Sequence, residues 1–420
     1  MSKINTELFI ARRISHRGGG QRGIMVRMAT LSVTIGMAVM IVALAVTGGF
    51  KQEITDKLVG FGADIRIVGY FSSDGSYESM PVTRNEGFIG EVREIDGVES
   101  VMPYITKSGI IRTPQAIHGV QLKGVAEDYD LSFFDRWLVE GELPQLADPA
   151  GRRDLLISRQ TADMLGFEVG DKVEMMFVGE GNSVRRDLYK VCGLFSTGMD
   201  DFDRATSVTH IDNLRRLNRW DESQQTGFEV KLSDFKQLDR VAEQVEEMVI
   251  AYNAAVTNDH DMIYAMTIKQ EYIGIFDWLA TMDVNGVVII TIMLAVALLN
   301  MVSALLIILL ERTSMIGLLK AVGMADGRLQ RVFLYRAASI ILRGMLFGNL
   351  LGMGIALVQK YTGLVKLDSS GYMLSSVPIE LDLTWWLALN VGVPLVLLLL
   401  LTIPVKIVSA IKPDQTMRYQ

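Results

Sequence analysis

The chain has 420 residues and a formal net charge of −7; half of its residues are hydrophobic and 21% are charged. Because the hydrophobic residues are concentrated in four stretches of 23 to 27 residues that are almost free of charge, the composition excludes a soluble enzyme, a disulfide-stapled secreted domain and a disordered chain. The single cysteine, Cys192, excludes an internal disulfide and a multi-cysteine metal site, so we expect no metal and no cofactor.

Residues 1–27 carry six basic side chains against one acid and precede the first uncharged stretch, residues 28–50. A helix of this length is about 35 Å long, which is enough to cross a hydrocarbon core of about 30 Å. The apolar run is too long for a signal peptide, so we expect an uncleaved membrane anchor. Leu8–Ile14 mixes apolar and basic residues, which is typical either of an amphipathic helix on the inner leaflet or of a basic flank that only fixes the orientation.

Residues 51–283 form the largest polar part of the chain, with 24 basic against 41 acidic side chains. Alternating side chains predict a half-buried strand at Ala63–Val68, and an apolar stripe predicts a helix at Thr83–Ile95. A second strand is expected at Val98–Ile105. This part of the chain is therefore expected to fold as a domain outside the membrane.

A similar order of elements returns near the end of the same part. Gly227–Leu232 alternates like a half-buried strand, and Ser233–Ile250 carries an apolar stripe at helical spacing. The two units resemble a repeated strand–helix element that flanks a middle region, about 126–205, which is richer in short strands and turns. A hairpin with its tip at Gly179–Asn182 is expected there. The predicted fold of this domain is α+β with a β-rich insertion.

Three further uncharged stretches follow, at 284–310, 337–359 and 383–405, and each is long enough to span a bilayer. The loop between the last two, 360–382, is short. By the positive-inside rule the segments rich in lysine and arginine are cytoplasmic, and four spans bring both termini to that side. These segments are residues 1–27, 311–336 and 406–420.

No motif of a catalytic or nucleotide-binding site is recognisable. The glycines at 18–20 are not followed by the lysine of a phosphate loop, so we expect no nucleotide site and no enzymatic activity in this chain. The cluster Asp200, Asp201 and Asp203 is too short for a calcium loop and is interpreted as a solvated acidic loop. Cys192 falls within a predicted strand and is interpreted as a small buried hydrophobe.

The segment after the second span predicts a short cytoplasmic helix followed by a glycine-containing turn. Its apolar residues Met315, Ile316, Leu319 and Val322 fall on one side of such a helix. This face is equally suited to dock into a groove on a partner protein and to lie on lipid.

Residues 311–323 have the pattern E-R-x-x-x-I-G-x-L-K-A-x-G, which resembles the signature of the FtsX-like and MacB-like permease subunits of ABC transporters. The closing run Ile411–Tyr419 resembles the end of the same family, as does the order of one span, a large external domain and three more spans. The resemblance implies that the segment after the second span touches a separate ATPase. The residues to which it assigns this coupling role are Glu311, Arg312, Ile316, Gly317, Leu319, Lys320, Ala321 and Gly323.

Within this superfamily the chain is most similar to the lipoprotein-releasing permeases of the LolC/LolE type. The local similarities are Gly48–Lys51, Trp137–Gly141, Gly193–Met199, the pair Phe202-Asp203, and Tyr372–Pro378. The resemblance implies an inner-membrane permease that pairs with a second copy or a paralogue and with two ATPase subunits, carries lipoproteins and binds no nucleic acid. In that family one paralogue hooks a periplasmic lipoprotein carrier with a longer loop. The corresponding stretch here, Phe177–Arg185, is short, which leaves carrier docking on this chain open.

Two sets of membrane residues are further candidates. Glycines at a spacing of four and one asparagine are candidates for helix packing by close approach and by an interhelical hydrogen bond. They are Gly344, Gly348, Gly352 and Asn300. Apolar residues near the outer ends of the spans are candidates for the lining of a substrate cavity. They are Val39, Val42, Val46, Val287, Ile290, Met293, Ile355 and Val358.

The expected function is ATP-driven extraction of lipoproteins from the outer leaflet of the inner membrane, and two alternatives remain open beside it. One is export of a drug or peptide by a MacB-like system, although such chains usually carry a fused ATPase. The other is an FtsX-like regulator that transmits ATPase motion to a cell-wall hydrolase, although such regulators generally have a smaller external domain.

Overall fold

The computed structural model of the chain describes residues 21–69, 81–114, 116–179, 183–258, 261–367 and 373–406. Most of the basic segment 1–27 with its amphipathic stretch, the hairpin tip at 180–182 and the tail with its 411–419 motif lie outside the described residues. The chain divides into two compact units, which are described separately. The helical unit comprises the described residues of 1–52, 278–366 and 376–420, and the sheet unit comprises those of 53–277 and 367–375.

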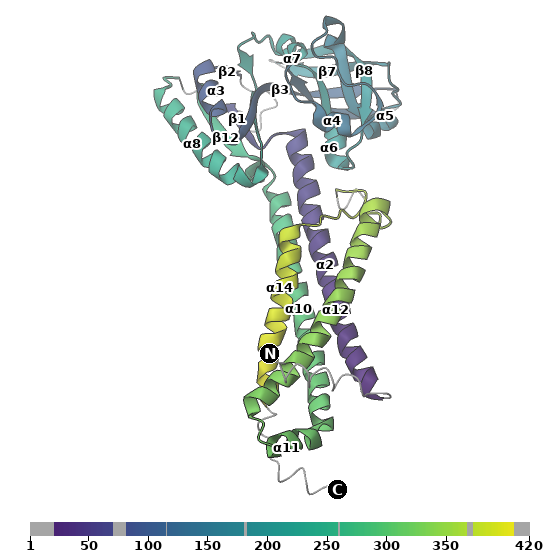
Figure 1. Cartoon of the computed structure of the whole chain (residues 1–420). Helices are drawn as coiled ribbons and strands as arrows, with labels where there is room; N and C mark the ends of the chain where they lie inside the picture. Colours follow the sequence, from purple (N-terminus) through teal and green to yellow (C-terminus); the bar gives the residue numbers. More distant parts are fainter. Residues whose placement is uncertain are drawn as a thin grey trace. The chain divides into compact units, whose positions relative to one another are not determined.

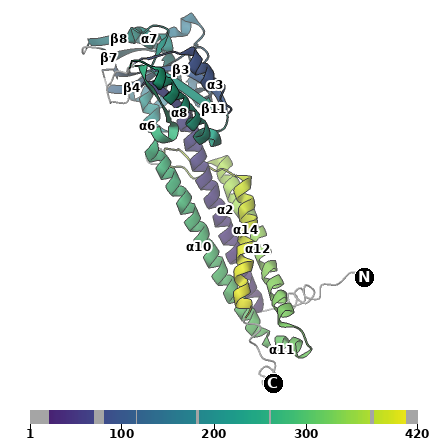
Figure 2. The ribbon, with the colours of Figure 1, turned by 90° about the vertical axis from the view of Figure 1, so that its left-hand side faces the viewer.

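Four helices in the described part of the chain are long and apolar enough to cross a membrane, which confirms the predicted four-span architecture. Figures 1 and 2 both show them side by side. They are α2 (Gln21–Phe61), α10 (Ile273–Glu311), α12 (Asp326–Thr362) and α14 (Leu383–Val405). The short helix α11 (Thr313–Ala321) lies between the second and the third of them.

The core of the helical unit is built by apolar side chains from all four long helices. Met37 of α2, Met301 of α10, Ile341 of α12 and Leu397 of α14 belong to one cluster, and none is more than 1% exposed. Other apolar side chains point outward, such as Leu346, which is 68% exposed. An apolar outer surface is what a helix bundle requires when lipid tails surround it.

The first two helices are longer than the spans predicted from the sequence. α2 has 41 residues and α10 has 39, so each is about 60 Å long, twice the thickness of a hydrocarbon core. The helix of the first span therefore does not end at residue 50, because α2 continues without a break to Phe61. In the same way α10 begins at Ile273, before the predicted second span.

The first lobe of the sheet unit is a split β-α-β arrangement built from the two repeated strand–helix elements. In the sheet the order is β12-β1-β11-β3, and every neighbouring pair is antiparallel. The first element consists of β1 (Ile65–Gly69), α3 (Glu86–Arg93) and β3 (Val98–Arg112). The second consists of β11 (Gly227–Leu232), α8 (Leu238–Ala255) and β12 (Ile263–Thr267).

The second lobe is a small barrel inserted between β3 and β11. The sheet continues from β3 through β4, β9, β6 and β8, and β7 pairs with both β8 and β3, which closes the ring. The strands are β4 (Ile117–Val125), β6 (Asp154–Ser158), β7 (Lys172–Gly179), β8 (Ser183–Phe195) and β9 (Thr206–His210), with β5 (Leu138–Gly141) on the edge. The helices are α4 (Ser132–Arg136), α5 (Arg159–Leu165), α6 (Asp200–Ala205) and α7 (Ile211–Asn218).

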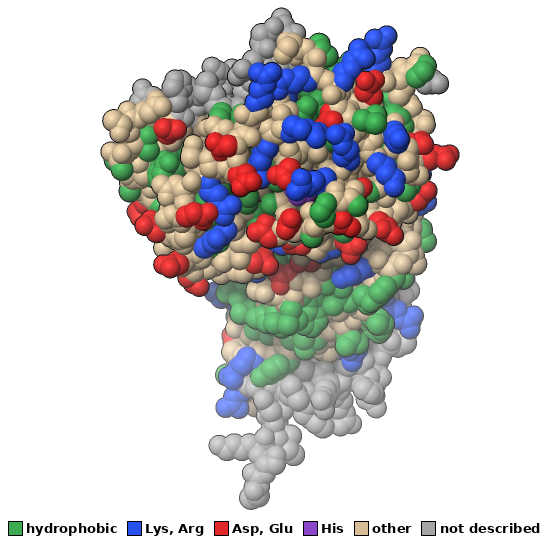
Figure 3. Space-filling view, turned by 90° about the horizontal axis from the view of Figure 1, so that it is seen from above, with side chains coloured by type: hydrophobic (Ala, Val, Ile, Leu, Met, Phe, Trp, Pro, Cys, Tyr) green, Lys and Arg blue, Asp and Glu red, His purple; other side chains and the backbone are tan. Residues whose placement is uncertain are grey.

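The barrel is filled by large apolar side chains such as Leu122, Val173 and Phe177, none of which is exposed. Together with β4 and α7, this lobe extends on both sides of the range 126–205 that the sequence suggests. Acidic and basic side chains are interspersed on the face of the sheet unit that Figure 3 shows. Surface ion pairs of this unit include those of Arg153 and Arg216 with Asp187.

The prediction that β1 and β11 are half-buried strands is wrong. Four of the five residues of β1 and five of the six residues of β11 are buried, so both faces of these strands are covered. The alternation itself is present, but the polar side chains Arg66 and Glu229 form an ion pair with each other instead of facing solvent. A single strand cannot reveal such a partner, because the two residues are far apart in the sequence.

Candidate functional site

The short helix α11 is stopped by a glycine turn. Val322 is its C-terminal cap, and Gly323 adopts a φ of +92°, a region that side-chain-bearing residues rarely adopt. The N–H of Gly323 donates to the carbonyl of Lys320 (3.0 Å), and that of Met324 donates to the carbonyl of Leu319 (2.9 Å). This pair of bonds is a Schellman motif, and it satisfies carbonyls that the end of a helix leaves unpaired.

Lys320 connects α11 to the next helix. Its ammonium lies 3.0 Å from a carboxylate oxygen of Asp326, and its side chain is only 10% exposed. Asp326 is the first residue of α12, where a negative charge is also favoured by the helix dipole. The segment after the second span is therefore a defined turn with two fixed ends rather than a loose loop.

The docking face predicted for α11 needs correction. Ile316 is fully buried and Leu319 packs against the core of the helical unit, so these two residues face their own bundle. Val322, which also belongs to the predicted face, is 81% exposed, and Leu318, which does not, is 63% exposed. The bundle therefore covers part of the face that the pattern offered to a partner or to lipid. Of the other coupling candidates, Gly317 is buried, and Glu311 and Ala321 are exposed. Arg312 precedes α11 and is partly buried, and its side chain makes no capping hydrogen bond.

The three spaced glycines of α12 lie against α2. A Cβ added at Gly344 would come within 2.7 Å of Val33, one at Gly348 within 2.6 Å of Met37, and one at Gly352 within 3.0 Å of the Ala38 backbone. The Thr34 hydroxyl also donates to the Gly344 carbonyl (3.2 Å). The stripe thus allows α2 and α12 of one chain to approach each other closely.

Asn300 of α10 donates a hydrogen bond to the hydroxyl of Ser32 in α2 (2.7 Å). Both residues line a groove of about 440 Å³ between these helices, together with Ser303 and the predicted cavity residue Met293. The groove is apolar apart from the side chains of Ser32, Asn300 and Ser303. Asn300 therefore joins two spans, as an interhelical hydrogen bond requires.

A larger groove runs along α2 and α12 and has a volume of about 920 Å³. Four of the predicted cavity residues, Val42, Val46, Ile355 and Val358, line it together. The others lie elsewhere: Met293 is in the first groove, and Ile290 packs against the bundle core. Val287 is 63% exposed, and Val39 is among the lining residues of neither groove.

The loop after α12 covers one end of the larger groove, and one amide holds the loop. Gln359 donates to the carbonyls of Val365 and Val377 (both 3.1 Å) and accepts from the N–H of Val365 (2.9 Å). Val365 and Val377 themselves line the groove. Gln359 was not among the residues predicted from the sequence, although a glutamine inside an apolar stretch marks a group that needs partners.

Gly49, at the end of the first charge-free stretch, has a structural role here. A Cβ at Gly49 would come within 2.5 Å of the carbonyl oxygen of Pro378, so only glycine lets this loop pass so close to α2. The N–H of Glu380 also donates to the carbonyl of Ala45 (3.0 Å). The loop is thus attached to both helices that form the groove.

A second polar group that was not predicted from the sequence joins α12 to α14. The Asn349 amide donates to the amide oxygen of Asn390 (2.7 Å), and the Trp386 indole donates to Asn349 (2.8 Å). Inside a bilayer such bonds hold helices together because lipid offers no alternative partner. α12 is therefore bonded to α14 on one side and packed through glycine on α2 on the other.

In the sheet unit, the motif around Thr197 is a buried loop rather than a solvated one. Asp203 is 2% exposed and accepts hydrogen bonds from the N–H and hydroxyl of Thr197 (3.0 and 2.6 Å) and from the N–H of Gly198 (3.2 Å). Burial raises its pKa above the usual value. The interpretation of this cluster as a solvated acidic loop is thus wrong for Asp203, which fixes the loop that precedes α6.

Cys192 lies in β8, and burial raises the pKa of its thiol to about 12. The thiolate that a nucleophile needs is therefore strongly disfavoured. Over the part of the chain that the structure describes, no group of three or more His, Cys, Asp or Glu side chains is placed to hold a metal ion.

Two family models match the chain. The one described as the MacB-like periplasmic core domain matches residues 28–248, and the one described as the FtsX-like permease C-terminal matches residues 287–413. Together they cover both units of the structure.

The individual relatives are named either as lipoprotein-releasing proteins or as macrolide exporters. The lipoprotein-releasing system transmembrane protein LolC of Neisseria meningitidis serogroup B is 23% identical over 92% of this chain and 92% of its own length. LolE of Haemophilus influenzae is 20% identical over 90% of this chain and 91% of its own. The macrolide export ATP-binding/permease protein MacB of Bdellovibrio bacteriovorus is 21% identical over 83% of this chain but 54% of its own length.

Proposed function

Because this chain belongs to the family of permeases with a MacB-like periplasmic core domain and an FtsX-like C-terminal region, we propose that it is the permease subunit of an ABC transporter that releases lipoproteins from the membrane. The observation that carries the proposal is the similarity to a lipoprotein-releasing LolC protein over 92% of both chains. The two units of the structure supply a membrane part and a part outside it.

In the proposed mechanism the ATP is hydrolysed by a separate ATPase, two copies of which bind a pair of permease subunits. The second permease is a copy of this chain or a paralogue. Residues 311–331 and both termini face the cytoplasm, and the sheet unit lies in the periplasm. Closure of the ATPases moves α11, and the long helices carry that movement to the sheet unit. The Schellman turn at Gly323 and the Lys320–Asp326 pair support this, because they make α11 a firm contact point.

A lipidated cargo explains why ATP is needed. Each buried methylene contributes about 0.8 kcal/mol to membrane anchoring, so three acyl chains amount to some tens of kcal/mol. Spontaneous escape into water is then negligible. Extraction requires work and an apolar surface that holds the chains on the way to an acceptor, for which a periplasmic carrier is a candidate.

The groove between α2 and α12 is the surface that we propose for an acyl chain. It extends from Thr34 to Val46 and from Phe347 to Gln359, about 18 Å of helix, which is close to the thickness of one leaflet. Its lining is almost entirely apolar. A photoreactive amino acid at Ile355 should therefore crosslink to the lipid of a cargo lipoprotein, whereas one at Leu399, which is also exposed but lies on α14, should not.

Depletion in the native cell tests the function. A lipoprotein destined for the outer membrane is pulse-labelled and followed by membrane fractionation after synthesis of this protein is stopped. The proposal expects the labelled lipoprotein to accumulate in the inner membrane. Delivery at the normal rate in depleted cells would remove the proposal.

Export of a small apolar molecule is the second candidate, because relatives named MacB are similar over 83% of this chain. It predicts that depletion sensitises the cell to drugs and leaves lipoprotein delivery unchanged. Signalling to a cell-wall hydrolase, suggested by the FtsX-like C-terminal region, predicts instead that a hydrolase copurifies with the protein in mild detergent.

A further inference from the structure

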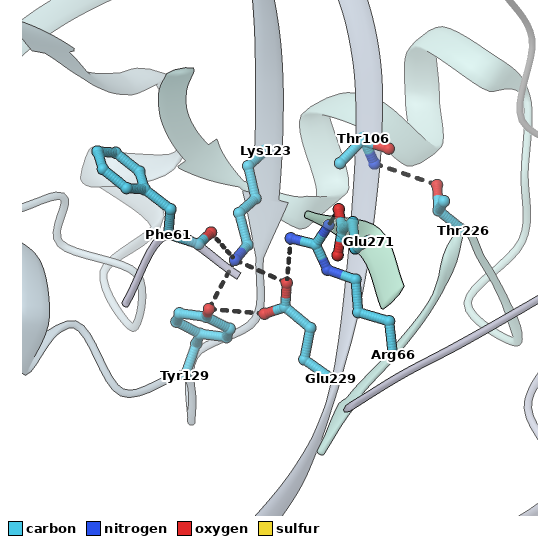
Figure 4. Close-up of polar contacts among 8 residues, drawn as sticks. All are labelled: Phe61, Arg66, Thr106, Lys123, Tyr129, Thr226, Glu229 and Glu271. Carbon is cyan, nitrogen blue, oxygen red and sulfur yellow. Dashed lines mark hydrogen bonds and ion pairs between the residues drawn. The ribbon is translucent and has the colours of Figure 1, made fainter. Parts of the chain in front are cut away.

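A network of buried charges lies in the sheet unit where α2 ends and α10 begins (Figure 4). Its members come from elements far apart in the sequence. We call it the ion clasp, and it consists of Arg66 of β1, Lys123 of β4, Tyr129, Glu229 of β11, and Glu271, the last residue of α9 (Ile268–Glu271). It contains two cations and two anions, so its net charge is zero.

Glu229 is the centre of the clasp. One carboxylate oxygen lies 2.8 Å from the Lys123 ammonium and 3.3 Å from the Arg66 guanidinium, and the other accepts from the Tyr129 hydroxyl (2.7 Å). The side chains of Lys123 and Glu229 are 5% and 3% exposed. Burial raises the pKa of Tyr129 well above its usual value, so the hydroxyl keeps the proton that it donates.

The clasp holds the end of α2 directly. Lys123 donates a hydrogen bond to the carbonyl oxygen of Phe61, the last residue of α2 (3.0 Å). The last carbonyls of a helix have no partner within the helix and carry its negative dipole end, so a buried ammonium satisfies both. Figure 4 shows this carbonyl pointing at the same ammonium that Glu229 holds.

The clasp also holds the start of α10. Arg66 forms an ion pair with Glu271 as well as with Glu229. Glu271 is separated from α10 by a single residue, Tyr272, whose carbonyl oxygen accepts from the N–H of Phe276 in the first turn of α10 (3.1 Å). The two long helices are therefore bonded to one charge group at their ends in the sheet unit.

Aromatic rings surround the same helix end. The centroid of the Phe61 ring lies 5.3 Å from that of Phe133 and 5.4 Å from that of Phe202, on which it stacks. The Phe202 ring in turn contacts Tyr272, with 5.3 Å between the ring centroids. One turn earlier, the Lys57 ammonium donates to the carbonyl oxygen of Thr197 in the loop before α6 (2.6 Å). The last turn of α2 is thus fixed directly to the barrel lobe, and Lys123 links it through Glu229 to the split β-α-β lobe.

A buried charge group of this kind is not needed for stability, because apolar residues of similar size are often as stabilising or more so. What it supplies is directional bonding. Its hydrogen bonds and ion pairs hold two helix ends and three strands in one arrangement and prevent them from sliding past one another. An apolar contact would permit such sliding.

Resting on the proposed function, we infer that the ion clasp is the rigid joint through which movement of α2 and α10 turns the sheet unit. Its members are positioning residues: they touch neither ATP nor cargo. Weakening the clasp therefore uncouples ATP hydrolysis from release, beyond any effect on folding.

The test uses the complete complex with its ATPase in proteoliposomes. The double variant Lys123→Met/Glu229→Gln removes one cation and one anion, leaves Arg66 paired with Glu271, and keeps an oxygen at 229 for Tyr129. We expect ATP hydrolysis at the wild-type rate and lipoprotein release per ATP lower by about ten-fold. The control is Val173→Ala, which opens a gap in the barrel core without touching the clasp.

A cargo-independent measurement separates this inference from the function on which it rests. Probes are attached at Ile250 in the sheet unit and Leu364 in the helical unit, both of which are exposed. ATP should change the distance between them in the wild type and in Val173→Ala but not in the double variant. If the wild type shows the distance change but no lipoprotein release, the proposed function is contradicted, whereas the inference about the ion clasp is not. If the double variant couples like the wild type, or if Val173→Ala uncouples equally, the clasp inference is overturned.

Discussion

At the scale of single residues, Asp64 is a buried acid with a predictable effect of pH on stability. Its side chain is 2% exposed and accepts a hydrogen bond from the N–H of Leu232 (2.7 Å). Burial raises its pKa to about 6, against the opposing effects of that N–H and of Lys231. The folded state therefore holds a proton that the unfolded state has released above its usual pKa of 3.8. The free energy of unfolding should consequently fall as the pH rises between about 4 and 6.

Replacing Asp64 by Asn removes this titration and leaves an oxygen for the N–H of Leu232. We expect the variant to be more stable than the wild type at pH 7, by at most about 3 kcal/mol, and the difference to vanish near pH 4. Thermal unfolding of the full-length protein in detergent across this pH range measures it. A difference between the two proteins that does not change with pH would contradict the assignment.

A substitution at Gly348 tests the close approach of α2 and α12. An alanine there would place its Cβ within 2.6 Å of Met37 and 2.8 Å of the Thr34 carbonyl oxygen, so the helices must separate. We expect Gly348→Ala to lower stability by about 1–3 kcal/mol. Gly354→Ala is the matched control on the same helix, because nothing lies within 4 Å of its added Cβ. Equal melting temperatures for the two variants would show that the stripe does not determine the packing.

At the scale of elements, the turn after α11 decides whether this helix can act as a contact point. An alanine at Gly323 must adopt a positive φ, which costs about 1–2 kcal/mol, or abandon the Schellman motif. We therefore expect Gly323→Ala to insert normally into the membrane and to lower lipoprotein release per ATP. Adding Lys320→Glu, which places a negative charge beside Asp326, should lower release further.

Gly327→Ala is the control for this element, because nothing lies near its added Cβ and its φ is not positive. ATP hydrolysis and release are measured side by side on reconstituted complexes. Release per ATP that is unchanged in Gly323→Ala would mean that α11 does not transmit the movement.

The elements that could be predicted from the sequence are those that are determined by residues close together in the chain. Charge-free runs of 23 to 27 residues specify membrane helices by themselves, and β11 begins and ends at the predicted residues. The burial of Glu229 and the orientation of Ile316 toward the bundle were not predictable, because both depend on partners distant in the sequence. The lengths of α2 and α10 were also missed, because the spans were predicted from charge-free runs, and these runs end at Lys51 and Asp283 although both helices continue.

The lining of the larger groove likewise includes residues that are recognisable in the sequence and residues that only the packing reveals. Val42, Val46, Ile355 and Val358 were found together because apolar residues at the outer ends of two spans are recognisable in the sequence. Val287 belongs to the same class of residue but faces outward, and only the packing of α10 reveals that. Gln359 was missed because its three hydrogen bonds are made to a loop whose path the sequence does not specify.

At the scale of the whole molecule, the two longest helices are the connection between the membrane and the sheet unit. Where the charge-free run of α2 ends, the helices are held together by an edge-on contact of Phe50 with Trp278 and by an ion pair of Lys51 with Asp283 (2.8 Å). Their far ends are fixed by the ion clasp. In the proposed mechanism this connection transmits the movement that a separate ATPase supplies.

The proposed function can be tested by reconstituting release. Proteoliposomes that contain the protein, its partner permease and the copurifying ATPase are loaded with a labelled triacylated lipoprotein, and the label that leaves the membrane for a soluble acceptor is measured. We expect release that requires hydrolysable ATP, and no ATP hydrolysis by the purified chain alone. Equal release without ATP, or hydrolysis by the chain without its partner, would contradict it.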